Sequence, residues 1–238
     1  MNITNTAAGQ RGWARLTGLG YLVIIAGALF SQIVARGGLI DGDDPQGTID
    51  AIRAAEDLWR LGFVAEIIAF CADVLVAFGF YVILKPISRN LALLAAFFRL
   101  VMAAVQALNM QNHYDVLFLI DDASWLAAFD PAQLAAMAML SLKAHTAGYM
   151  IGLVFFGFGN AVLGFALLRS RYVPALISFL VMVGALAVAG GLIAIFLDPA
   201  ISEMISPWYM LPTFFGEVSL ALWLVIMGVK VPAASKAG

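Results

Sequence analysis

Six long apolar runs constrain this chain more than any other feature of its sequence. Each has about 20 residues, the length that an α-helix needs to cross about 30 Å of hydrocarbon. They cover residues 16–35, 61–84, 91–110, 147–168, 173–197 and 208–229. Only 12% of the residues are charged, whereas a soluble domain has about 25%. The sequence therefore predicts an all-α polytopic membrane protein, a single domain over residues 1–238 built as a bundle of six transmembrane helices.

The charged residues between these runs separate into two groups. Four segments carry Lys and Arg without acids, at Arg11, Arg15, Lys85, Arg89, Arg169, Arg171, Lys230 and Lys236. The other three loops carry the acids Asp41, Asp43, Asp44, Asp50, Glu56, Asp57, Asp115, Asp121, Asp122, Asp130, Asp198 and Glu203. Basic residues accumulate on the cytoplasmic side of membrane proteins. Both termini are therefore expected in the cytoplasm, and the three acidic loops are expected outside.

Each acidic loop contains an Asp-Pro pair, at residues 44–45, 130–131 and 198–199. Asp is a good N-cap, and Pro suits the first turn of a helix. The segments 46–59 and 132–143, which follow the first two pairs, are compatible with helix. We expect them to be either short outer helices or extensions of the second and fourth spans.

Three charged residues fall at a similar depth in three different predicted spans. At a rise of about 1.5 Å per residue, Asp73, Arg99 and Glu217 lie roughly 16, 14 and 18 Å from the inner ends of their helices. A charged side chain at the bilayer centre costs a few kcal/mol or more. The three residues, here called the midplane cluster, are therefore expected to face one another inside the bundle. Asn160, in the inner half of the fourth span, is a further candidate.

A second polar layer is predicted nearer to the outer side. Positions seven residues apart share about the same helix face, and the layer continues from the midplane cluster at this interval along the second and third spans. Its members at this interval are Glu66, Gln106 and His113. Asn109 lies on the flank of the third span, and His145 lies at the outer entry of the fourth. Both histidines are expected at the outer boundary, either in a plain interfacial role, as titrating groups, or as metal ligands with Asp115. Trp59, Trp208 and Tyr209 are expected in an outer aromatic belt.

The polar residues allow two main functional interpretations. The midplane cluster could bind or transport a small solute or protons, with Arg99 holding an anionic group and Asp73 or Glu217 changing protonation. Alternatively, the cluster is a structural ion pair in a non-catalytic membrane scaffold or accessory subunit. An intramembrane enzyme is the third interpretation and is not expected, because the chain has no zinc-binding, nucleophile-elbow or phosphate-loop motif.

Several expectations concern partners and packing. No metal or other cofactor is expected, and no nucleic acid, because no basic patch carries interleaved aromatics. The expected partner is the lipid bilayer, with a small polar or anionic ligand under the first interpretation. The substrate, the coupling ion and the oligomeric state stay open.

Glycines of the fourth and fifth spans are expected to allow close helix packing, with a broken helix at residues 190–191 as the alternative. They are Gly152, Gly157, Gly159, Gly164, Gly184, Gly190 and Gly191.

A set of short motifs resembles one known family over about residues 15–230. The motifs are residues 60–62 (RLG), Asp73, residues 85–86 (KP), 91–99 (LALLAAFFR), 148–149 (GY), 155–157 (FFG), Glu217, 222–224 (LWL) and Gly228. They are similar to the uncharacterised bacterial multi-pass membrane family called domain of unknown function 4386. The resemblance implies a six-span protein of the bacterial inner membrane, and it implies no activity, substrate or cofactor. Asp73, Arg99 and Glu217 fall on the recurring motifs of this family, whereas Glu66 does not.

Overall fold

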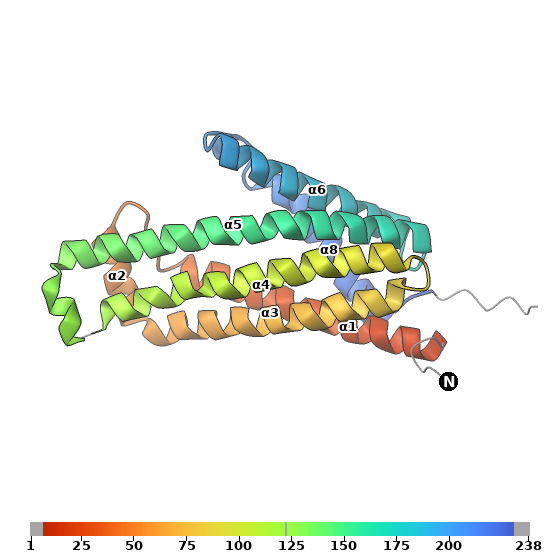
Figure 1. Ribbon diagram of the computed structural model, residues 1–238, viewed down its shortest axis with the longest axis horizontal. Helices are drawn as coiled ribbons and strands as arrows, with labels where there is room; N and C mark the ends of the chain where they lie inside the picture. The colour runs from red at the N-terminus through yellow and green to blue at the C-terminus, as the bar shows by residue number, and fades with distance from the viewer. Residues whose placement is uncertain (1–6, 122, 231–238) are drawn as a thin grey trace, which may run out of the picture. The chain divides into compact units, whose positions relative to one another are not determined.

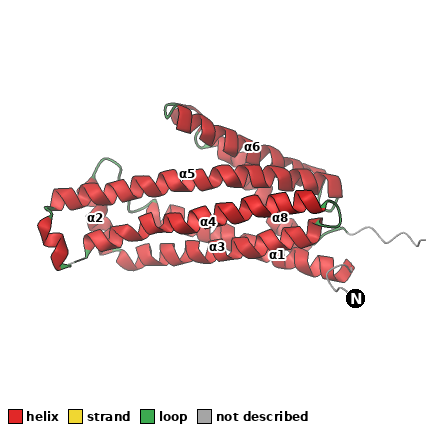
Figure 2. Ribbon diagram, viewed as in Figure 1, coloured by secondary structure: helices red, strands yellow, loops and turns green. Residues whose placement is uncertain are grey.

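The computed structural model describes residues 7–121 and 123–230, and within these ranges every regular element is a helix (Figures 1 and 2). The all-α class is therefore confirmed. Asp122 and Lys236, which contributed to the charge pattern, lie outside the described residues. The elements are α1 (Ala7–Leu29), the π-helix η2 (Phe30–Arg36), α2 (Pro45–Ala54), α3 (Glu56–Leu84), α4 (Arg89–Ile120), the 3-10 helix η3 (Ser124–Ala128), α5 (Pro131–Ser170), α6 (Ala175–Leu197), α7 (Ile201–Ile205), the 3-10 helix η4 (Trp208–Met210) and α8 (Leu211–Ile226).

Six helical segments of the described chain are long and apolar enough to cross a membrane, as the six apolar runs predict. They are Ala8–Arg36, Glu56–Leu84, Arg89–Ile120, Pro131–Ser170, Ala175–Leu197 and Trp208–Ile226. Two of them are much longer than the apolar runs from which they were predicted. The third span continues to Ile120 rather than ending at residue 110, and the fourth begins at Pro131 rather than at residue 147.

The two outer segments that follow Asp-Pro pairs behave differently from each other. Asp44 caps α2 by accepting a hydrogen bond from the Gly47 N–H at 2.8 Å. Because α2 ends at Ala54 and α3 begins at Glu56, most of segment 46–59 is a separate outer helix. Asp130 caps α5 in the same way, accepting from the Gln133 N–H at 2.8 Å. However, α5 runs without interruption to Ser170 (Figure 1), so segment 132–143 extends the fourth span.

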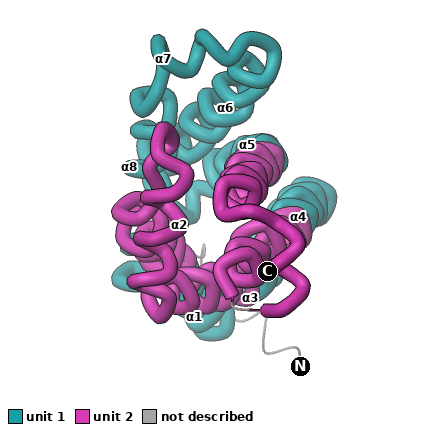
Figure 3. Tube along the Cα trace, turned by 90° about the vertical axis from the view of Figure 1, so that its left-hand side faces the viewer, with its two compact units in different colours: residues 1–22, 72–102, 153–238 teal, residues 23–71, 103–152 magenta. Residues whose placement is uncertain are grey.

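The chain divides into two compact units, coloured in Figure 3. Unit 1 comprises residues 1–22, 72–102 and 153–238, and unit 2 comprises residues 23–71 and 103–152. The single-domain prediction stays a prediction. The division separates the two polar layers, because the whole midplane cluster belongs to unit 1 and the whole outer polar layer belongs to unit 2.

In unit 1, glycines permit close approach of helix backbones. A Cβ atom on Gly164 of α5 would lie 2.6 Å from the backbone N of Met182 on α6, and one on Gly216 of α8 would lie 2.9 Å from the backbone N of Val181. Helix α6 is continuous through residues 190–191, where a break was the alternative expectation. A Cβ atom on Gly190 would meet nothing within 4 Å, so this glycine is not needed for packing in the described chain.

In unit 2, α2 and the outer parts of α4 and α5 enclose a hydrophobic core. The core residues are Ile49, Ile52, Trp59, Val116, Leu117, Leu119, Ile120, Leu126, Ala135, Ala138, Met139 and Leu142. Burial of these side chains explains why both helices continue beyond the predicted spans. It also corrects the expected aromatic belt, because Trp59 is 0% exposed whereas Trp208 is 66% exposed.

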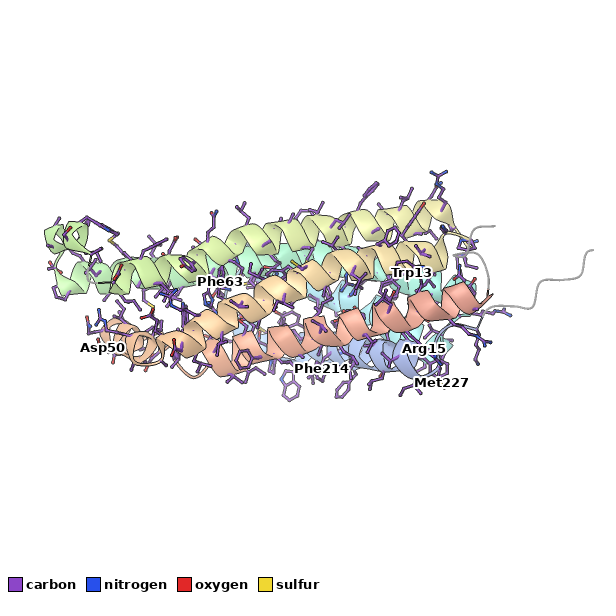
Figure 4. All side chains as sticks on the ribbon, turned by 90° about the horizontal axis from the view of Figure 1, so that it is seen from below. Trp13, Arg15, Asp50, Phe63, Phe214 and Met227 are labelled. Carbon is purple, nitrogen blue, oxygen red and sulfur yellow. The ribbon has the colours of Figure 1, made fainter. Side chains whose placement is uncertain are left out.

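The outer surface of unit 1 is rich in large apolar side chains. Phe214 and Met227, labelled in Figure 4, are both well exposed, and they are accompanied by exposed leucine, phenylalanine and tryptophan side chains on α6, α8 and η4. A soluble monomer rarely exposes apolar surface on this scale. A lipid bilayer is the environment that such a surface requires.

We expect Gly164→Ala to destabilise the protein by about 1–3 kcal/mol, because the added methyl group forces α5 away from α6. Gly190→Ala is the matched control, and it should be neutral or stabilising by up to about 1 kcal/mol, since alanine favours helix and has free space there. Thermal unfolding of the detergent-solubilised variants measures both effects. Equal stability of the two variants would show that close packing at Gly164 does not matter.

Candidate functional site

Two residues of the midplane cluster, Asp73 on α3 and Arg99 on α4, form a buried ion pair in unit 1. The Nε–H of Arg99 donates to Oδ1 of Asp73 at 2.8 Å, and Nη2 of Arg99 lies 2.7 Å from the same oxygen. The two residues are 2% and 4% exposed. Asp73 and Arg99, which the sequence places at a similar depth, are therefore in direct contact.

Asn160 on α5 connects this ion pair to Glu217 on α8. Its Oδ1 accepts a hydrogen bond from Nη1 of Arg99 at 3.4 Å, and its Nδ2 donates to Oε1 of Glu217 at 2.6 Å and to the hydroxyl oxygen of Tyr21 at 3.3 Å. The ring of Tyr21, on α1, also lies under the guanidinium, with 4.6 Å between Cζ of Arg99 and the ring centroid. Glu217 therefore joins the cluster through an uncharged amide.

The space beside the midplane cluster is small. A cavity of about 10 Å³ lies against Arg99 and Asn160 and is otherwise lined mainly by apolar side chains and a glycine: Ala77, Phe80, Ala95, Ala96, Gly159 and Leu163. A volume of about 10–15 Å³ is the minimum for one water molecule. This cavity has room for about one water molecule, and it is too small for an organic solute.

Three members of the outer polar layer come together in unit 2. Glu66, His113 and His145 are 1%, 0% and 1% exposed, and one ligand-type atom from each lies within 4.8 Å of those of the other two. We call this group the Glu-His-His cluster. The acid beside the histidines is thus Glu66, whereas Asp115, the expected companion, is partly exposed and is not part of the group.

The histidines do not have the plain boundary position expected for them. His113 stacks on Trp59, with 4.1 Å between ring centroids. Nε2 of His113 donates to the backbone O of Trp59, and Nε1 of Trp59 donates to the backbone O of His113, each at 3.2 Å. The reason is the added length of α4 and α5, which carries helix and core well past both histidines.

Two polar residues of the π-helix η2, which the sequence interpretation did not include, complete this region. Nε2 of Gln32 donates to Oε1 of Glu66 at 2.6 Å, and Nη1 of Arg36 lies 3.2 Å from Nδ1 of His113. The first span was expected to end at residue 35, and no role was predicted for Arg36, which is 5% exposed and is the last residue of the first membrane-length helical segment. Short π-helical segments are frequent at functional sites.

Gln106 and Asn109 on α4, also predicted for the outer layer, bind to the backbone of α5. Nε2 of Gln106 donates to the backbone O of Tyr149 at 3.1 Å, and Nδ2 of Asn109 donates to the backbone O of His145 at 2.9 Å. A Cβ atom at Gly152 would lie 2.7 Å from the amide of Gln106. These amides therefore help to hold α4 and α5 together where glycine leaves them room.

A wide groove in unit 2 reaches the edge of the Glu-His-His cluster. Its volume is about 750 Å³, and Asn109, which contacts His145, forms part of its wall. Phe63, labelled in Figure 4, lines it as well. The other principal wall residues are Leu108, Asn112, Tyr114, Asp115, Phe118 and Gly148. The groove is mainly apolar, with a few polar groups near Asn109.

Comparisons with known proteins give a family but no activity. A family model described as domain of unknown function (DUF4386) matches residues 16–228. A protein of Archaeoglobus fulgidus, described as uncharacterised, is 31% identical over 160 residues, which cover 67% of this chain and 78% of the relative. No solved structure matches the chain.

We expect Asp73→Asn to destabilise the protein by about 3–5 kcal/mol, because it leaves the buried guanidinium of Arg99 without its charge partner. The double change Asp73→Asn with Arg99→Gln should recover a large part of this loss. Thermal unfolding and expression yield in detergent measure both variants. The control is Asp50→Asn, which breaks the exposed pair between Asp50 and Arg53 and should cost about 1 kcal/mol or less. An Asp73→Asn variant as stable as this control would show that the buried pair does not hold the helices together.

Proposed function

Because this chain belongs to the family defined by domain of unknown function 4386, a description that names no activity, we propose its function from the geometry of unit 1. The proposal is a membrane-embedded proton-binding protein. Its exchangeable proton resides on Glu217, and the ion pair between Asp73 and Arg99 forms the fixed part of the same cluster. The observation that carries the proposal is the presence of two carboxyl groups around one guanidinium.

The charges of the midplane cluster do not balance when both acids are ionised. Arg99 contacts Asp73 directly, at 2.7–2.8 Å, whereas the 2.6 Å contact of Glu217 is to the neutral amide of Asn160. One negative charge is then in excess on Glu217, which is partly buried on a helix that is apolar enough to cross a membrane. A charge without a partner is costly in such an apolar setting. One proton bound by Glu217 makes the cluster neutral. Asp73 is the less suitable carrier, since protonation there would leave Arg99 unpaired.

Proton binding agrees with the cavity better than solute binding does. The space of about 10 Å³ beside Arg99 suits a water molecule that carries protons to or from the cluster. It does not suit a small polar or anionic solute, and the guanidinium of Arg99 is already engaged by Asp73. The second candidate function is a non-catalytic membrane scaffold or accessory subunit, and the near-complete burial of the ion pair favours it.

The proposed location is the inner, cytoplasmic membrane of a prokaryotic cell, with both termini inside. The separation of basic and acidic loops supports this orientation. The resemblance pointed to bacteria, and the archaeal relative extends the similarity beyond them. The proposed location is therefore the cytoplasmic membrane of a prokaryote, and it does not specify a bacterial source.

Infrared spectra of the full-length protein in nanodiscs test the proton site during a pH titration. The wild type should show a protonated-carboxyl stretching band that disappears as the pH rises, and Glu217→Gln should abolish this band. Glu203→Gln, which changes an exposed glutamate on α7, is the matched control and should leave the band unchanged. If Glu217→Gln retains the band, or if the wild type lacks it, the scaffold function is favoured instead.

Labelling of single cysteines tests the orientation. Cys71 is the only cysteine, so Cys71→Ala provides a background into which Gly42→Cys or Asn90→Cys is introduced. Both positions are exposed, and a Cβ atom on Gly42 meets nothing within 4 Å. In intact spheroplasts, a membrane-impermeant maleimide should label position 42 and not position 90. The reverse pattern would place both termini outside.

A further inference from the structure

We propose that Glu66, His113 and His145 in unit 2 form a binding site for a divalent transition-metal ion such as Zn²⁺, Fe²⁺ or Mn²⁺. The proposal does not depend on the proton site, which lies entirely in unit 1. It also differs from the sequence interpretation, which expected no metal.

The residue types and their spacing fit such an ion. Two imidazoles and one carboxylate are ligands that Zn²⁺ and Fe²⁺ accept, with positions left over for water. The three ligand atoms lie within 4.8 Å of one another. Metal–ligand bonds of about 2.1 Å place tetrahedral ligand atoms roughly 3.4 Å apart. Side-chain movements of roughly 1 Å therefore close the site around an ion.

The hydrogen bonds of the two histidines leave one ring nitrogen of each with a lone pair for the ion. Nε2 of His113 donates to the backbone O of Trp59 at 3.2 Å, so Nδ1 carries the lone pair. Nδ1 of His145 lies 3.4 Å from both the backbone O and the side-chain Nδ2 of Asn109. Because Nδ2 of Asn109 already donates to the backbone O of His145 at 2.9 Å, we assign Nδ1 of His145 as the donor to the carbonyl, and Nε2 then carries the lone pair. This Nε2 is buried and has no hydrogen-bond partner among the described residues.

Glu66 shows the same division between a held atom and a free atom. Its Oε1 accepts from Nε2 of Gln32 at 2.6 Å, while its Oε2 is buried and has no partner within the described ranges. Metal-binding histidines and carboxylates are typically fixed by an outer partner on the atom that does not bind the metal. All three side chains of the Glu-His-His cluster meet this condition through Gln32, Trp59 and Asn109.

Arg36 occupies the remaining lone pair in this structure. Its Nη1 lies 3.2 Å from Nδ1 of His113, and its Cζ lies 5.6 Å from the centroid of the Trp59 ring. A guanidinium and a metal ion cannot share one lone pair, and their positive charges repel. Binding of the ion therefore displaces Arg36 from His113.

Titration of the chelator-treated, full-length protein in nanodiscs with Co²⁺ tests the site, because the visible absorption of Co²⁺ reports its ligands. We expect one equivalent to bind, with competition by Zn²⁺. Glu66→Gln and His145→Gln should each weaken binding by roughly 100-fold or more, beyond the smaller losses typical of outer partners. Arg36→Gln should tighten binding by about 10-fold, because it removes the competing charge.

Three controls keep this experiment decisive. Glu56→Gln, on the same helix as Glu66 but partly exposed, should bind Co²⁺ like the wild type. Glu217→Gln in unit 1 should also bind normally, which separates this site from the proton site. Metal-free unfolding curves establish whether each variant is folded. If Glu66→Gln does not fold, His145→Gln alone tests the ligand set. The proposal is overturned if the wild type binds no stoichiometric Co²⁺ at about 100 μM, or if folded ligand variants bind it as tightly as the wild type.

Discussion

The requirement that governs this structure is that polar groups buried in an apolar bundle must find partners within the protein. The contact between Asp73 and Arg99 meets this requirement for the two most costly groups, and neighbouring polar side chains arrange themselves around it. Asn160 uses both ends of its amide, accepting from Arg99 and donating to Glu217 and Tyr21. A single ion pair thus determines which polar atoms of α1, α5 and α8 face the middle of unit 1.

Unit 2 meets the same requirement with hydrogen bonds to backbone carbonyl groups. Trp59 and His113 exchange bonds with each other's backbone, and Gln106 and Asn109 bind to carbonyl oxygens of α5. Folded proteins leave few buried polar atoms without a partner. In the described part of unit 2, Ser31, Glu66, Gln106 and His145 each have one buried side-chain atom without a partner. The atoms of Glu66 and His145 are informative because they lie close together and are of chemical types that bind metal ions.

The sequence predicted the spans and the contact between Asp73 and Arg99 because both depend on fixed dimensions, the bilayer thickness and the helical rise. It did not predict the contacts of Tyr21 or Trp59 with the polar clusters, since aromatic side chains in apolar segments carry no pattern that separates a site from a core. It allowed for the extension of α5, as one of two alternatives, but missed the extension of α4, which depends on packing in the core that α2 shares. Arg36 did give a signal, because it is a cation at the end of an apolar span that the charge pattern predicts to face outside, where basic residues are unfavoured.

The two polar clusters differ in their charged groups, and this difference separates the two proposals. In unit 1, one guanidinium faces two carboxyl groups, so the proposed proton makes the charges balance. In unit 2, Arg36 and Glu66 carry opposite charges beside two histidines, so the proposed divalent ion adds net positive charge. The metal-site proposal therefore requires Arg36 to move away from His113. Because Arg36 is the last residue of the π-helix η2, the same proposal couples occupancy of the Glu-His-His cluster to the position of this end of the first span.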